Sequence, residues 1–187
     1  IMINIVGKSI AINFSLPLWL DTIGTCIAAY FTGIWGAVIT AVGGIVVYGL
    51  FFESTWYYYI ITAIIIALFY AFSFKRNKIL SFTKLMLSGY WAGVISIIVS
   101  VPVNMIFGDG KSGNYWGGIF FDMLMYKETP LLFCSVCDQL VIDCIDKMLS
   151  VAIAYLIIIL SKKISFKKSM TIPKTFSFFV AFFVSLT

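Results

Sequence analysis

The chain contains no histidine, and Asp, Glu, Lys and Arg together make up only 11 % of its 187 residues. A soluble globular protein has about 25 % charged residues. Without histidine, the sequence lacks the most frequent general base and a frequent metal ligand. It also lacks a Walker A loop, a GxSxG nucleophile elbow and an HExxH zinc motif. We therefore expect neither an enzyme nor a metal or other cofactor.

Cysteine is scarce as well, with four residues at Cys26, Cys134, Cys137 and Cys144. Cys134 and Cys137 have the CxxC spacing of half a zinc site, but no second CxxC follows. Cysteines in membrane helices usually act as small apolar residues, and we interpret these four in that way.

Apolar residues dominate the sequence. Hydrophobic residues make up 61 % of the chain, and the mean hydropathy is +1.04. The apolar runs are unbroken and lack the alternation of a membrane-spanning strand, so helices must satisfy the backbone polar groups within the bilayer. The composition predicts an all-α integral membrane protein.

The net charge of +5 does not indicate nucleic-acid binding, because most basic residues lie in two short segments. Those nine are Lys75, Arg76, Lys78, Lys84, Lys162, Lys163, Lys167, Lys168 and Lys174. Clustered Lys and Arg in short loops mark the cytoplasmic side of a membrane protein. This topology places the long Gly-rich loop, residues 108–130, outside.

The pattern of apolar runs predicts six membrane helices in one bundle, residues 1–163. Their expected bounds are about 1–14, 20–33, 35–52, 56–74, 84–107 and 131–160. The turn Gly33-Ile34-Trp35-Gly36 divides one long apolar run into two helices. Loop 108–130 contains a short apolar segment that can act as a lid. Residues 164–187 read as a basic linker and the start of a possible extra span.

The most informative feature is a polar stripe on the last helix. Gln139, Asp143, Asp146, Lys147 and Ser150 fall within an arc of about 100° when a helix advances about 100° per residue. Ionisable groups within a bilayer normally face a partner or a wet cavity. The stripe favours a helix that lines a polar, ligand-binding cavity; the alternative is a structural polar network between helices.

Three further residues could reach the same cavity from outside the last helix. They are Asn104 near the end of its helix, and Trp116 and Asp122 in the long loop. We therefore predict a binding site composed of Asn104, Trp116, Asp122, Gln139, Asp143, Asp146 and Lys147. A site rich in acids disfavours multiply charged phosphates and favours a neutral or cationic ligand, or a polyol.

The chain resembles the substrate-binding S components of energy-coupling factor (ECF) transporters. The resemblance is carried by the segment from Asn13 to Thr25 (NFSLPLWLDTIGT), the turn from Gly33 to Ala37, and Asp143-x-x-Asp146-Lys147. It implies a six-helix bundle in the bacterial plasma membrane that captures a small vitamin-like compound. It also implies a transmembrane coupling subunit and two cytoplasmic ATPases as partners, with Gly7 and Ala11 contacting the coupling subunit.

Two other functions stay open. Related entry segments occur in the sensor regions of bacterial membrane kinases, so the chain could be the ligand-sensing domain of a signalling protein. The polar stripe could also belong to a structural protein in which it only specifies helix packing.

Overall fold

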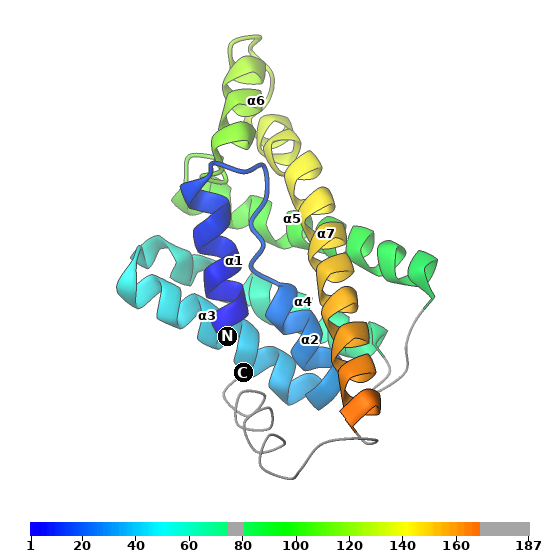
Figure 1. The fold of residues 1–187 in the computed structure, drawn as a ribbon. Helices are drawn as coiled ribbons and strands as arrows, with labels where there is room; N and C mark the ends of the chain where they lie inside the picture. Colours follow the sequence, from blue (N-terminus) through cyan, green and yellow to red (C-terminus); the bar gives the residue numbers. More distant parts are fainter. Residues whose placement is uncertain (75–80, 169–187) are drawn as a thin grey trace.

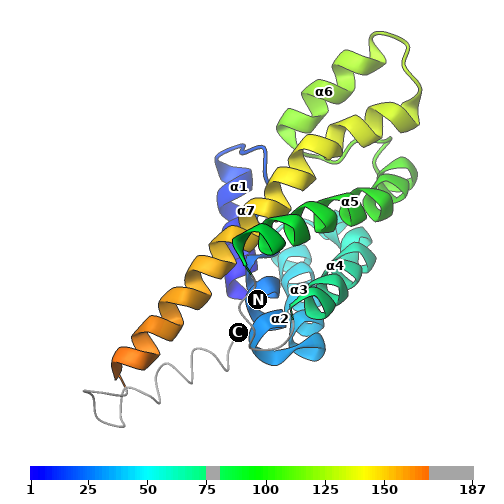
Figure 2. The same cartoon turned by 90° about the vertical axis from the view of Figure 1, so that its right-hand side faces the viewer.

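The structure is a computed structural model that describes residues 1–74 and 81–168. The described chain is entirely helical, with no strand, which confirms the predicted all-α class. The elements are α1 (Met2–Asn13), α2 (Ile23–Thr32), α3 (Ile34–Phe51), the 3-10 helix η1 (Ser54–Tyr59), α4 (Ile60–Ser73), α5 (Phe82–Phe107), α6 (Tyr115–Met125) and α7 (Leu131–Lys168). The long helix α7 packs against α5, α6 and α2, whereas α3 packs against α1, α2, α4 and η1 (Figures 1 and 2).

Local sequence explains most of these boundaries. Gly33, which alone separates α2 from α3, has a φ of 77°, a conformation that glycine adopts without a steric penalty. The predicted helix 56–74 is instead the short η1 followed by α4. The last helix extends beyond the predicted residue 160 to Lys168, whereas the proposed extra span lies largely outside the described residues.

The long loop also differs from its prediction, because it contains the helix α6. Asn114 begins this helix with a side-chain cap: its carbonyl oxygen accepts the N–H groups of Trp116 at 3.0 Å and Gly117 at 3.4 Å. Such a cap satisfies backbone donors that have no partner within the helix. In Figures 1 and 2, α6 and the first turns of α7 form a hairpin at one end of the molecule.

In the part of the chain that the structure describes, four helical segments are long and apolar enough to cross a membrane: Ile34–Phe51, Ser54–Ser73, Phe82–Phe107 and Leu131–Lys162. This indicates a membrane protein. A full span needs about 20 residues, whereas α1 has 12 residues and α2 has 10. Within the described residues, four of the six expected membrane helices therefore have the length of a span, and α1 and α2 do not.

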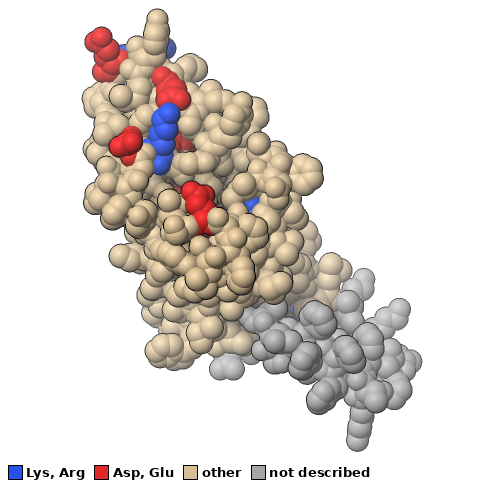
Figure 3. Space-filling view, turned by 90° about the vertical axis from the view of Figure 1, so that its left-hand side faces the viewer, with Lys and Arg blue, Asp and Glu red and all other residues tan. Residues whose placement is uncertain are grey.

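The surface agrees with a membrane environment. Large apolar side chains are exposed on several helices, among them Trp35 on α3, Phe72 on α4 and Ile98 on α5. On the face drawn in Figure 3, charged side chains gather in the upper half, towards α6. Exposed apolar area on this scale is typical of a surface that contacts lipid or another protein.

The α5–α7 interface places the polar stripe of α7 inside the bundle. Gly89 and Gly93 lie one turn apart on α5, where an added Cβ would approach the Cα atoms of Met148 and Cys144 to 2.7 Å in each case. Such a small-xxx-small pair lets two helix backbones pack directly against each other. Another side of α7 carries Asp146 and Lys147, which contact the loop that follows α1, residues 14–22, here called the α1–α2 loop.

Candidate functional site

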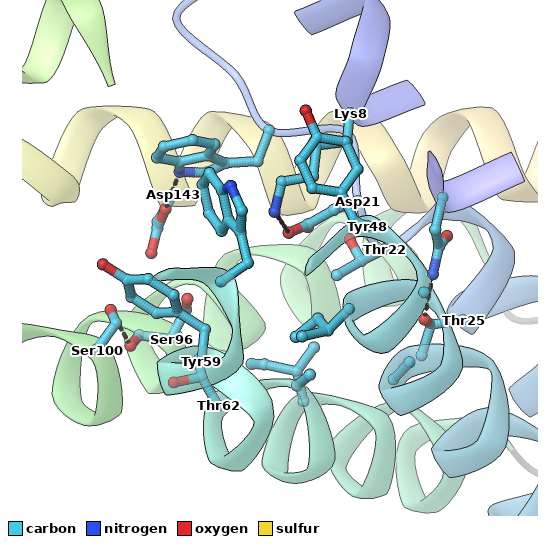
Figure 4. A pocket seen from close by; sticks show the side chains of 18 of the residues that line it. Lys8, Asp21, Thr22, Thr25, Tyr48, Tyr59, Thr62, Ser96, Ser100 and Asp143 are labelled. Atoms are coloured by element: carbon cyan, nitrogen blue, oxygen red, sulfur yellow. Dashed lines mark hydrogen bonds and ion pairs between the residues drawn. The ribbon is translucent and has the colours of Figure 1, made fainter. Parts of the chain in front are cut away.

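The bundle encloses a cavity of about 80 Å³. Its polar lining comes from nearly every element of the described chain except α6 (Figure 4). The polar and aromatic lining residues are Asn4, Lys8, Trp19, Asp21, Thr22, Thr25, Tyr48, Trp56, Tyr59, Thr62, Ser96, Ser100, Ser112, Gln139, Asp143 and Lys147. One water needs about 10–15 Å³ by this kind of measure, so several waters or one small organic molecule fit.

α7 contributes Gln139, Asp143 and Lys147 to the lining, at intervals of one helical turn. All three side chains are at most 4 % exposed. Gln139 accepts a hydrogen bond from the Ser100 hydroxyl of α5. This part of the polar stripe therefore faces a cavity rather than lipid.

Asp146 lies behind the cavity wall and binds the α1–α2 loop. One carboxylate oxygen accepts the backbone N–H groups of Trp19 at 2.9 Å and Leu20 at 2.6 Å. The other accepts the ammonium of Lys147 at 2.6 Å. Asp146 was predicted to belong to the binding site, whereas in the structure its hydrogen bonds hold the α1–α2 loop.

Lys147 forms ion pairs with two carboxylates, Asp146 and Asp21 at 3.1 Å. Lys147 and Asp143 are one turn apart on α7, but no ion pair joins them. The α1–α2 loop brings Asp21 to the ammonium from outside the helix. Burial opposes ionisation of Asp21, yet the charges of Lys147 and Lys8 hold the pKa of this carboxyl below its ordinary value.

Lys8 of α1 is the second cation of the cavity, and its ammonium sits among aromatic rings. The Nζ atom lies 3.0 Å from the ring centroid of Trp56, 4.9 Å from Tyr48 and 6.0 Å from Trp19. It is also 4.0 Å from the carboxylate of Asp21, the pair seen in Figure 4. Aromatic faces attract cations, so this arrangement stabilises a buried ammonium.

Asp143 has a different environment from Asp21 and Asp146. Its Oδ1 atom accepts the indole N–H of Trp19 at 3.2 Å. This donor is neutral, and within residues 1–74 and 81–168 no lysine or arginine forms an ion pair with Asp143. Asp143 is only 3 % exposed.

Three buried polar atoms of lining residues have no hydrogen-bond partner in the described part of the chain. They are Oγ1 of Thr22, Oγ1 of Thr62 and Nε1 of Trp56. Buried polar groups in folded proteins are nearly always paired with protein or with water. The cavity is therefore suited to hold water or a polar ligand against these atoms.

The other predicted site residues lie away from the cavity lining. Asn104 is fully buried and accepts the hydroxyl of Tyr59 at 2.5 Å, so it positions a lining residue. Trp116 is 45 % exposed. The side chain of Asp122 is 65 % exposed and pairs with Lys111 at 2.7 Å. These last two belong to α6, which projects from the bundle instead of folding over the cavity.

Gly7 and Ala11 were predicted to contact a partner subunit, but both are buried within the chain. A Cβ at Gly7 would collide with the carbonyl oxygen of Leu20. The α1–α2 loop therefore covers this face of α1. Ala11 is 1 % exposed, and its carbonyl accepts the N–H of Leu16 in the α1–α2 loop.

Sequence reasoning missed the contribution of α1. Asn4 donates to the Thr25 hydroxyl at 2.9 Å and accepts the N–H of Gly24 at 2.7 Å, which ties α1 to α2. Asn4 and Lys8 are one turn apart in an apolar helix, a second polar stripe that could have predicted a buried face. Among the described residues, no three His, Cys, Asp or Glu side chains gather as a metal centre requires.

Comparisons of the chain with protein-family models, with curated proteins and with solved structures found no match.

Proposed function

We propose that this protein is the substrate-capturing membrane subunit of an ECF-type importer, and that it binds a small, water-soluble, vitamin-like compound. The observation that carries the proposal is the cavity itself. It lies inside a bundle of apolar helices and is lined by charged side chains and by the unpartnered atoms of Thr22, Thr62 and Trp56. A binding site with a few directed polar groups in a largely apolar wall is typical for small molecules.

The α1–α2 loop is the proposed cover of the site. It supplies Trp19, Asp21 and Thr22 to the lining. On its far side, the Trp116 indole donates to the Ser15 carbonyl at 2.7 Å, and Asn114 donates to the Leu16 carbonyl at 3.2 Å. Hydrogen bonds and ion pairs join the loop to α6 and α7. Release of the loop would admit a polar ligand, and closure would replace the hydration of that ligand.

The partners follow from the proposed transport cycle. The sequence has no Walker A loop, so ATP hydrolysis must occur in separate subunits. We propose a transmembrane coupling subunit and two cytoplasmic ATPases in the bacterial plasma membrane. Because Gly7 and Ala11 pack against the chain's own loop, the coupling subunit would dock on another face of the bundle.

The decisive experiment is mass spectrometry of small molecules released from protein purified in mild detergent. We expect one compound in near-stoichiometric amount. The variant Thr62→Leu, which replaces the cavity hydroxyl with apolar atoms, should retain less of this compound. The matched variant Thr83→Leu, at an exposed position on α5, should retain the wild-type amount. Release of no compound, together with no stabilisation by a metabolite extract, would contradict the proposal.

A second function is supported by the shape of α7. This helix is continuous over 38 residues, a length of about 57 Å at 1.5 Å per residue. It carries Asp143 and Lys147 in its first half and is described as far as Lys168. One continuous helix therefore connects the cavity with residues several turns away. A ligand-sensing domain needs such a connection.

Purification of the tagged full-length protein from its own membranes separates the two functions. A coupling subunit and two ATPases that remain bound, and ATP-dependent uptake after reconstitution, support the importer. Ligand binding without these subunits or uptake would instead favour the sensor.

A further inference from the structure

We infer that the ligand of the cavity is a small organic cation, and that its positive charge pairs with Asp143. This inference rests on the proposed function of ligand capture and names the chemical class of what is captured. It depends on the balance of charge around the cavity, on the unequal partners of the carboxylates, and on the aromatic wall.

The ionisable groups at the cavity carry an excess of negative charge. Lys8 and Lys147 are the two cations, and Asp21, Asp143 and Asp146 are the three carboxylates that contact the cavity or its cations. With every side chain in its ordinary ionised form, the cluster has a net charge of −1. An uncompensated charge is unfavourable in a buried environment, so an additional cation would stabilise the cluster.

The missing partner can be assigned to Asp143. Lys147 pairs with Asp146 at 2.6 Å and Asp21 at 3.1 Å, and the ammonium of Lys8 lies 4.0 Å from Asp21. Both ammonium groups are thus matched to the other two carboxylates. Among the described residues, Asp143 accepts a hydrogen bond only from the neutral indole of Trp19, and it forms no ion pair. The cavity therefore offers no unpaired cation to an anionic ligand, but it offers the unpaired carboxylate of Asp143 to a cationic one.

The aromatic wall beside Asp143 already accommodates one cation. Trp19 and Trp56 pack edge to face, with their ring centroids 5.3 Å apart, and both rings lie near the ammonium of Lys8. Trp19 also touches Asp143 through its indole N–H, so the same ring links the two parts of the cavity. Aromatic faces combined with a carboxylate are a frequent means of recognising organic ammonium groups.

Two unpartnered hydroxyls complete the site. Thr22 and Thr62 line the cavity, and both are 8 % exposed. Their Oγ1 atoms have no hydrogen-bond partner among the residues that the structure describes. A hydroxyl can either accept from or donate to a ligand, so these atoms suit a cation that also carries a hydroxyl or amine. The volume of about 80 Å³ limits the ligand to a compact molecule.

The test uses three probes of similar shape and different charge on the purified, unmodified full-length chain. They are choline, its neutral carbon analogue 3,3-dimethylbutan-1-ol, and the anion 3,3-dimethylbutanoate. Each is titrated while the thermal unfolding midpoint is measured, since a ligand that binds the native state raises it. We expect choline alone to stabilise the protein. Equal or greater stabilisation by the neutral or anionic probe, or no stabilisation by choline, would overturn the inference.

A pair of variants tests the assignment to Asp143. Asp143→Asn keeps the size of the side chain and removes its charge, and we expect it to weaken choline binding about tenfold or more. Asp122→Asn makes the same change at the exposed position on α6 and should bind choline as the unmodified protein does. Unchanged affinity in Asp143→Asn would overturn the assignment. If that variant does not fold, Asp143→Glu, which retains the charge, should still prefer choline to its neutral analogue.

The outcome also separates this inference from the proposed function. If mass spectrometry finds a neutral or anionic compound released from the protein, capture stands and the cationic class is wrong. If choline selectivity is found but no uptake follows reconstitution with partner subunits, the cation site stands and the importer proposal fails.

Discussion

The polar face of α7 and the α6 hairpin contain similar residues but provide opposite environments. Asp143 on α7 is 3 % exposed and Asp122 on α6 has a side chain that is 65 % exposed. Trp19 donates its indole N–H to a buried carboxylate, whereas Trp116 donates to a backbone carbonyl near the surface. The comparison shows that residue type does not determine a role in binding. Removal from water makes the charge of Asp143 important, because solvent screens that of Asp122.

The largest difference between the two regions should appear when each loses a carboxylate. Asp146→Ala leaves the N–H groups of Trp19 and Leu20 without their carboxylate acceptor, and it removes one of the two carboxylates that pair with the ammonium of Lys147. We expect a loss of about 3–5 kcal/mol in the free energy of unfolding. Asp122→Ala should change it by less than about 1 kcal/mol. Denaturant unfolding in detergent measures both, and equal losses would contradict the distinction.

Glycine substitutions should show the same contrast in packing. Gly93→Ala places a Cβ 2.7 Å from the Cα of Cys144, where backbone atoms cannot yield easily. The overpacking should cost about 1–3 kcal/mol and lower the thermal midpoint. Gly118→Ala on α6 meets no atom within 4 Å and should leave the midpoint unchanged or raise it slightly, since alanine favours helix. If Gly93→Ala were as stable as the unmodified protein, α5 and α7 would have to lie further apart than in the structure.

Two tryptophan substitutions provide a finer comparison of hydrogen bonds. Trp19→Phe removes the indole donor at 3.2 Å from Asp143 and should cost about 1–3 kcal/mol, because the carboxylate is buried. Trp116→Phe removes a bond of 2.7 Å at an exposed position, and water can replace it, so about 0.5 kcal/mol is expected. Thermal unfolding of both variants, with choline present and absent, also shows whether Trp19 contributes to binding. A smaller effect for Trp19→Phe than for Trp116→Phe would reverse our interpretation.

The smallest effect should come from the ion pair between Lys111 and Asp122. Its atoms are 2.7 Å apart, but the two side chains are 43 % and 65 % exposed. A double-mutant cycle with Lys111→Ala and Asp122→Ala should give a coupling energy of about 0.2–1 kcal/mol, which added salt reduces. A coupling energy of several kcal/mol would indicate that this ion pair is shielded from solvent in the functional protein.

The sequence by itself determined those features that depend on neighbours along the chain. The apolar runs predicted helices, Gly33 marked the turn between α2 and α3, and the spacing of Gln139, Asp143 and Lys147 predicted one polar face. Helical periodicity is a local property, so one sequence suffices to predict it. The conclusion that this face would be buried followed from the cost of charge in a bilayer.

Only the tertiary structure decided which partners each polar group received. Trp19 and Asp143 are 124 positions apart in the sequence, and Lys8 is further still from Lys147. Nothing in the local pattern indicated that the α1–α2 loop would bind Asp146, or that Asp143 would receive only the neutral indole N–H of Trp19. Nor did it indicate that α6, with Trp116 and Asp122, would project away from the cavity. Long-range packing determines such pairings, because many arrangements of the same helices satisfy the local pattern equally well.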